Sequence, residues 1–85
     1  MALTRDEFLR LLPVAVNHAG YQVIENVISQ VDGKWNITLE RKPALRIALL
    51  VMPVLGVTVE ITDATPERAN RFIARFLLGY QRAGG

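Results

Sequence analysis

A long apolar run, from Ala44 to Thr62, limits the folds open to this 85-residue chain more than any other stretch. Between Arg46 and Glu60 the run carries no charge, and Thr58 is its only polar side chain in that interval. An uncharged stretch of this length is too short for a membrane-spanning helix, which needs about 20 apolar residues. Its many β-branched residues and its alternating character are typical of strands in a hydrophobic core.

Two strands are predicted inside this run, at residues 45–51 and 57–62. Pro53 and Gly56 lie between them, and both residue types are common in turns. We therefore expect a hairpin turn at residues 52–56. This turn is unusual because hairpin turns normally face water and are polar, whereas residues 52–55 are all apolar.

The N-terminal segment predicts a helix over residues 4–19. Thr4 and Glu7 have the spacing of a capping box, in which the threonine hydroxyl accepts a hydrogen bond from the Glu7 amide. Pro13 lacks an amide hydrogen, so we expect a kink there. Gly20 is expected to end the helix as its C-terminal cap.

Two more strands are predicted before the apolar run, at residues 21–31 and 34–41, with Arg41-Lys42-Pro43 as a polar turn after them. Asp32-Gly33 is a strong hairpin signal between the two. The polar pair Glu25-Asn26 predicts a bulge in the first strand, or a break that divides this strand into two.

The register of the predicted hairpin depends on the length of its loop. A three-residue loop at 32–34 sets Glu25 opposite Arg41, which is a favourable pair of opposite charges. A two-residue turn sets Glu25 opposite Glu40. We favour the longer loop because the shorter one opposes two carboxylates.

The last helix is predicted to begin near residue 65, because Thr65-Pro66-Glu67 combines a capping threonine, a first-turn proline and an acid. Its apolar residues recur at the 3- and 4-residue spacing of one buried stripe: Ala69, Phe72, Ile73, Phe76, Leu77 and Tyr80. Gly79 is expected to begin the end of this helix. Residues 82–85, which include Gly84-Gly85, are expected to form a frayed, flexible tail.

The predicted elements follow the order α-β-β-β-β-α in a single domain over residues 1–85. Short connections favour an antiparallel meander of four strands, and the apolar face of that sheet needs both helices as its cover. We therefore expect a two-layer α+β fold with both helices packed on one face of the sheet.

Composition narrows the class of protein. Hydrophobic residues make up 51% of the chain and charged residues 21%, which are values typical of a globular domain. The chain has no cysteine, so a disulfide framework and thiolate metal ligands are excluded, and we expect a cytoplasmic protein. A formal net charge of +2 indicates little about partners.

The apolar turn is the first candidate site. It is predicted to dock another protein, most simply a second copy of the chain, through these residues: Leu50, Met52, Pro53, Val54 and Leu55. The alternative is that a helix end or the N-terminal segment covers these side chains within one subunit. Burying such a patch at about 25 cal/mol per Å² would contribute several kcal/mol to association.

Four arginines of the last helix form the second candidate site, a contact for nucleic acid or another polyanion: Arg68, Arg71, Arg75 and Arg82. The alternative, which we favour, is an ordinary solvated helix face. Few exposed aromatic or lysine residues accompany the arginines, and a nucleic-acid surface normally combines both.

No residue pattern predicts catalysis. His18 is the only histidine, and its place near a predicted helix end indicates a contact with the helix dipole instead of a general base. The carboxylates are scattered singly, and no glycine-rich phosphate loop is present. We therefore expect a small non-enzymatic protein-interaction module without a metal or cofactor, with polyanion binding as the alternative function.

Overall fold

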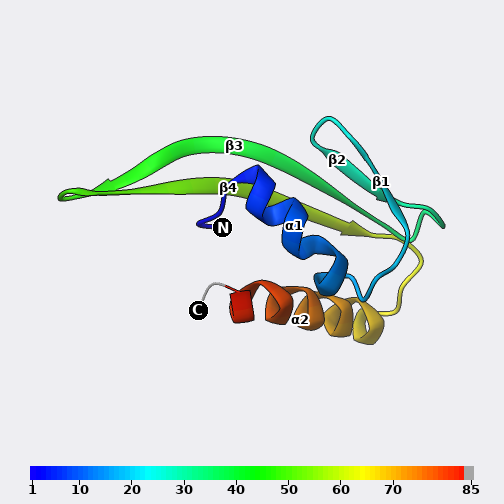
Figure 1. Ribbon diagram of the computed structural model, residues 1–85. Helices are drawn as coiled ribbons and strands as arrows, with labels where there is room; N and C mark the ends of the chain where they lie inside the picture. The colour runs from blue at the N-terminus through cyan, green and yellow to red at the C-terminus, as the bar shows by residue number, and fades with distance from the viewer. Residues whose placement is uncertain (84–85) are drawn as a thin grey trace.

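The computed structural model describes residues 1–83, with Ile47, Arg82 and Ala83 described by their backbone alone. Its elements, in chain order, are α1 (Arg5–Ala15), β1 (Tyr21–Ile24), β2 (Val27–Gln30), β3 (Trp35–Ile47), β4 (Leu50–Ile61) and α2 (Pro66–Ala83). The strands form one antiparallel sheet in the order β1-β2-β3-β4, and both helices lie on the same face of it (Figure 1). The predicted α+β meander and its α-β-β-β-β-α order are confirmed.

The two long strands differ from the prediction in where the chain turns. β3 continues through Arg41-Lys42-Pro43 and β4 continues through residues 52–56, so neither of the predicted turns exists. The chain reverses instead at Ala48-Leu49, between β3 and β4. A shift of register between Lys42 and Leu45, of the kind a β-bulge produces, separates the inner and outer parts of this hairpin.

Both prolines of the hairpin occupy positions that a strand tolerates. The backbone N–H groups of Leu39 and Leu55 donate to segments outside the β3–β4 ladder, so odd-numbered residues in this part of the hairpin direct their polar groups outward. Pro53 belongs to the same odd-numbered series of β4, and Pro43 lies in the register shift between Lys42 and Leu45, where it has no ladder partner. Neither proline therefore removes an N–H from the ladder of the hairpin.

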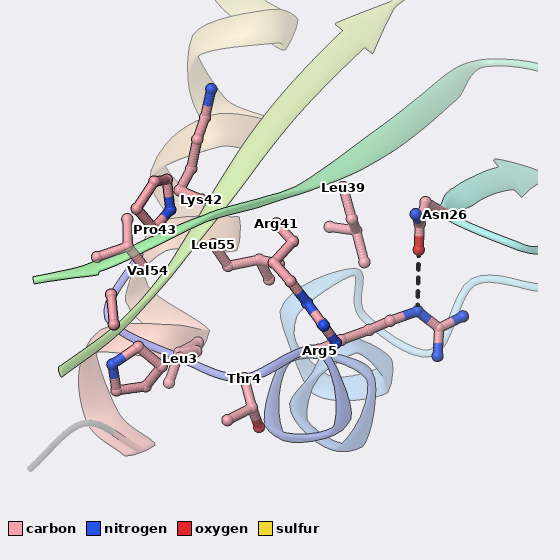
Figure 2. Close-up of a pocket in the computed structure, with 12 residues that line it drawn as sticks. Leu3, Thr4, Arg5, Asn26, Leu39, Arg41, Lys42, Pro43, Val54 and Leu55 are labelled. Atoms are coloured by element: carbon pink, nitrogen blue, oxygen red, sulfur yellow. Dashed lines mark hydrogen bonds between the residues drawn. The ribbon is translucent and has the colours of Figure 1, made fainter. Parts of the chain in front are cut away.

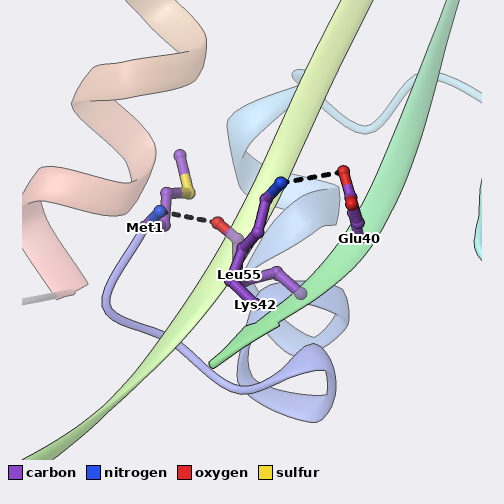
Figure 3. A network of polar contacts seen from close by, with 4 residues as sticks. All are labelled: Met1, Glu40, Lys42 and Leu55. Carbon is purple, nitrogen blue, oxygen red and sulfur yellow. Dashed lines mark hydrogen bonds and ion pairs between the residues drawn. The ribbon is translucent and has the colours of Figure 1, made fainter. Parts of the chain in front are cut away.

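Gly56 serves strand packing and not a turn. A Cβ atom on Gly56 would lie 2.9 Å from Cε of Lys42 and 3.3 Å from the carbonyl oxygen of Glu40. The Lys42 side chain passes over the glycine and forms an ion pair with Glu40, with 3.1 Å between Nζ and Oε2 (Figure 3). A turn former thus lies inside a strand because the neighbouring strand needs its small volume.

The first predicted strand, residues 21–31, is divided into β1 and β2 by a two-residue turn at Glu25-Asn26. This division is one of the two outcomes expected for that polar pair. Glu25 has φ of 54°, in the left-handed region. Arg5 stabilises the turn, because its Nη2 donates to the Glu25 carbonyl at 2.6 Å and its Nε donates to Asn26 Oδ1 at 3.2 Å.

The register that we favoured between the second and third strands of the sheet is wrong. Ile28 pairs with Ile37 and Val27 pairs with Thr38, which is the register of the two-residue turn. The pair of opposed carboxylates that argued against it does not form, because Glu25 lies in the β1–β2 turn. The observed register also brings Ile28 and Ile37 together in the core, where both side chains are fully buried.

The first helix is shorter than predicted. It ends at Ala15, with Val16 as its cap, and does not reach residue 19. Asn17 and His18 then adopt positive φ values of 56° and 58°. The chain has therefore left the helix before Gly20, and the cap predicted for that glycine is wrong.

Both helix starts follow the sequence. The Glu7 amide donates to Thr4 Oγ1 and the Arg68 amide donates to Thr65 Oγ1, each at 3.2 Å. The end of α2 differs, since the helix passes through Gly79 and continues to Ala83. Of the tail expected at 82–85, residues 84–85 lie outside the described part of the chain.

The core lies between the sheet and the helices. Its largest fully buried side chains are Phe8, Leu12, Ile28, Ile37 and Phe76. A line of aromatic rings passes through it, with successive centroids 4.8 to 6.3 Å apart: Tyr21, Trp35, Phe72, Phe76, Tyr80 and Phe8. The Tyr80 hydroxyl also donates to the Phe8 carbonyl at 2.9 Å, which ties α2 to α1.

Candidate functional site

The outer part of the β3–β4 hairpin projects from the domain as a two-stranded ribbon, which we call the arm (residues 43–53). In Figure 1 it extends past the N-terminus and past the end of α2. The molecule measures 44 × 25 × 20 Å, and its radius of gyration is 13.6 Å. A compact domain of this length has a radius of gyration of about 12 Å. The arm thus makes the molecule elongated.

Apolar side chains of the arm are exposed on both of its faces. The register pairs Leu45 with Met52, which lie on one face, and pairs Arg46 with Val51 on the other. Leu45, Leu50 and Val51 are each about half exposed, and Leu49 is wholly exposed. None of the buried core side chains in the described part of the chain belongs to the arm. Leu45, Leu49, Leu50 and Val51 are therefore left largely uncovered by the described part of the chain.

The exposed area of the whole chain leads to the same conclusion. A compact monomer of 9.5 kDa exposes about 5,000 Å². This chain exposes 6275 Å², so the excess is roughly 1,200 Å² relative to that expectation. A specific protein–protein interface buries about 800 Å² on each partner. The excess is thus as large as one side of a stable interface.

The tip of the arm, Ala48-Leu49, is an unusual turn. Two-residue hairpin turns favour asparagine and glycine, because they require positive φ. Ala48 adopts φ of 54° although it carries a Cβ atom, and Leu49 beside it contacts only solvent. The conformational preferences of two-residue turns therefore do not explain why alanine and leucine occupy these positions. The tip is thus both apolar and held in a conformation that is disfavoured for an L-residue.

The edges of the arm are poorly suited to adding a further strand. Pro43 and Pro53 each lack a backbone N–H, one on each side of the base of the arm. Arg41 and Arg46 are exposed along β3. Charge and proline are the features that block pairing between sheet edges. Contacts of the arm are therefore expected to use its side-chain faces and its tip.

A groove of about 610 Å³ lies at the base of the arm, between β3–β4 and the start of α1. Leu3, Pro43 and Val54 contribute apolar surface to it. Arg5 and Arg41 line it from α1 and β3, respectively, and the Arg5 side chain extends to Asn26 (Figure 2). Arg41 has no hydrogen bond or ion pair with any other described residue. The groove thus combines an apolar surface with cationic donors.

The five residues predicted as an interface lie in different environments. Leu50 and Pro53 are exposed, whereas Met52 and Val54 are half-buried. Leu55 is buried in the core at 6% exposure, and the N-terminal segment covers it. Its N–H donates to the Met1 carbonyl at 2.7 Å. Its carbonyl accepts from the Met1 amino group, also at 2.7 Å (Figure 3). For Leu55, the alternative of cover within one subunit is the observed one.

Three of the four predicted arginines are brought together. Arg68, Arg71 and Arg75 are exposed and surround a second groove, of about 390 Å³, between α2 and the end of α1. Arg75 Nη2 donates to Asn17 Oδ1 at 2.8 Å. The side chain of Arg82 lies outside the described residues. These guanidinium groups form no ion pair with a described carboxylate.

The described residues offer little support for catalysis by His18, for a metal site or for a membrane-spanning helix. His18 is exposed just beyond α1, where its backbone N–H donates to the Pro13 carbonyl at 2.7 Å. Within residues 1–83, no three His, Asp or Glu side chains gather closely enough to hold a metal ion. No helix in that range is long and apolar enough to cross a membrane.

Sequence reasoning missed Leu45, Leu49 and Val51 as surface residues of the site. It missed them because the turn was placed at residues 52–56, where proline and glycine occur, and the true turn at Ala48-Leu49 contains neither. Compared with known proteins, the chain matches no family model, no curated protein and no solved structure. Its function is therefore argued from the geometry of the arm and the two grooves.

Proposed function

We propose that this chain is a small, non-enzymatic protein-interaction module that forms a homodimer through its arm. The observation that carries the proposal is the projecting hairpin, whose apolar side chains lack cover while the chain exposes about 1,200 Å² more than a compact monomer would. A second copy is the simplest partner, because a two-fold interface uses one self-complementary surface. The cysteine-free composition supports a cytoplasmic location for this dimer.

The proposal is tested by measuring mass in solution with light scattering on a sizing column, over about a hundredfold range of concentration. We expect a mass near twice the 9.5 kDa of the chain. The double variant Leu50→Lys with Val51→Lys places a charge on each face of the arm, where the native side chains are 56% and 55% exposed. It should be folded and monomeric, because the charges would have to be buried in the interface.

Ile24→Lys is the matched control, since Ile24 is 69% exposed on β1, away from the arm. This variant should remain dimeric. A wild-type chain that stays monomeric at every concentration contradicts the proposal, and so does a lysine double variant that dimerises normally.

Polyanion binding is a second candidate function, supported by the uncompensated positive charge of Arg68, Arg71 and Arg75 around one groove. Binding of a short RNA at low salt, measured by fluorescence anisotropy, should weaken steeply as salt is added. Arg71→Glu with Arg75→Glu should abolish it and leave the mass of the dimer unchanged. Apolar association of the arm, in contrast, should not weaken with added salt. RNA binding that persists in this variant contradicts the candidate.

A further inference from the structure

We infer that the dimer is reciprocal: the arm tip of each copy lies in the groove at the base of the other copy's arm. This inference rests on the proposed function, since it specifies which surfaces of the two copies meet. It makes the groove a composite site, which the partner's Ala48-Leu49 completes. Three observations carry it, namely the chemistry of the tip, the chemistry of the groove and the length of the arm.

The tip presents an apolar side chain and unpaired carbonyls. Leu49 is wholly exposed, and its neighbour Ala48 is held at positive φ. In a two-residue turn closed by Ile47 and Leu50, the carbonyls of the two turn residues lie outside the ladder. A complementary site must therefore supply apolar surface for Leu49 and hydrogen-bond donors for these carbonyls.

The groove supplies both. Leu3, Pro43 and Val54 offer apolar surface, and Arg5 and Arg41 line the same groove (Figure 2). Each guanidinium carries five N–H donors and no acceptor. Arg5 uses two of its nitrogens on the β1–β2 turn, and Arg41 uses none on the described part of the chain. Free donors thus remain for the carbonyls of an inserted turn.

Because of its length, the arm cannot place its tip in the groove at its own base. The tip can reach only the groove of a second copy, whose tip then reaches the groove of the first. Leu49 lies six positions after Pro43 in the chain, which places the tip about 20 Å from the base of its own arm. Two arms aligned antiparallel about a two-fold axis bring each tip to the other's base, and the contact is closed after two copies. Because proline blocks both edges at the base, the arms approach by their faces and tips.

Cysteine cross-linking tests this arrangement, because the chain contains no native cysteine and every cross-link between single-cysteine variants is intermolecular. Leu49→Cys places a thiol at the tip. Ala44→Cys is a small change at an exposed residue that lines the groove. When the two variants are mixed and oxidised, we expect a disulfide-linked heterodimer as the main product. Ser29→Cys, at an exposed position on β2, is the control and should give little product with Leu49→Cys.

The outcomes separate the inference from the proposed function. A dimer by light scattering that cross-links only through two Leu49→Cys copies overturns the reciprocal arrangement and leaves self-association intact. Equal product with the Ser29→Cys control overturns it too, because random collision would then explain the cross-links. A wild-type monomer overturns both ideas. Leu49→Asp, which leaves the core untouched, should reduce the association constant at least tenfold if the tip is buried, and no change in that constant contradicts the inference.

Discussion

At the scale of single residues, Gly79 shows how a small side chain decides a helix contact. A Cβ on Gly79 would lie 2.9 Å from the Ala15 Cα and 3.0 Å from its Cβ, and backbone atoms of a packed helix cannot move aside. Gly79→Ala should therefore lower the free energy of unfolding by about 1–3 kcal/mol through overpacking, although alanine is the better helix former by about 1 kcal/mol.

Urea unfolding followed by circular dichroism measures this effect. Asn70→Ala, at an exposed position of α2, is the control and should raise stability by a few tenths of a kcal/mol. A Gly79→Ala variant as stable as this control would show that α1 and α2 do not approach each other as closely as described.

Because the Tyr80 phenol is buried, we predict that the folded protein loses stability at high pH. Burial raises the pKa of the Tyr80 phenol above its ordinary value of 10.0, and electrostatic repulsion from the Tyr21 phenolate adds to the rise. The folded state thus holds the phenolic proton more tightly than the unfolded state. The resulting stability is fully present below pH 10 and is lost as the pH rises toward the folded pKa, with a slope of up to about 1.4 kcal/mol per pH unit.

Tyr80→Phe should remove most of this slope, because it deletes the titrating group. It should also cost about 0.5–1.5 kcal/mol at neutral pH through the lost hydrogen bond to the Phe8 carbonyl. Urea midpoints of both proteins between pH 8 and pH 11 test the prediction. Parallel pH profiles for the two proteins would refute the assignment to Tyr80.

At the scale of elements, the arm hairpin is strained at its tip. Ala48 has φ of 54°, a conformation that costs an L-residue about 1–2 kcal/mol and glycine much less. Ala48→Gly should therefore protect the amide hydrogens of the arm from exchange more strongly than in the wild type. Ala44→Gly, at an exposed β3 position without positive φ, should reduce that protection. Hydrogen exchange measured by NMR tests whether amide protection rises in Ala48→Gly and falls in Ala44→Gly. A loss of protection in both variants would contradict the prediction that the turn is strained at Ala48.

At the scale of the whole molecule, the arm and the core are separable. The buried core of the described residues includes Leu39 and Leu55 but no residue between them. Replacing residues 43–53 with Asn-Gly would close β3 and β4 at the observed Lys42–Val54 pair with a favourable two-residue turn. This shortened chain should unfold cooperatively and be monomeric, as judged by circular dichroism and light scattering. A shortened chain that is unfolded when monomeric would instead make the arm part of the folding unit.

The sequence by itself determined the class of fold. The apolar run is too short to span a membrane, and its β-branched residues and alternating character indicate strands, which the structure has as the outer part of β3 and the whole of β4. The caps at Thr4 and Thr65 are local hydrogen bonds, so neighbouring residues specify them and the prediction of both helix starts was right. The stripe of α2 follows from helix periodicity, although Leu77 remains half exposed.

Only the tertiary structure decided where the sheet turns and which surface is left uncovered. Pro53 and Gly56 indicate a turn when read locally, but their strand positions depend on the partner strand, which directs one outward and needs the small volume of the other. The β2–β3 register depends on the distant turn at Glu25, which removes the unfavourable carboxylate pair. Exposure of the arm depends on how far the helices reach along the sheet. These are relations between segments far apart in the chain, and short-range sequence patterns do not contain them.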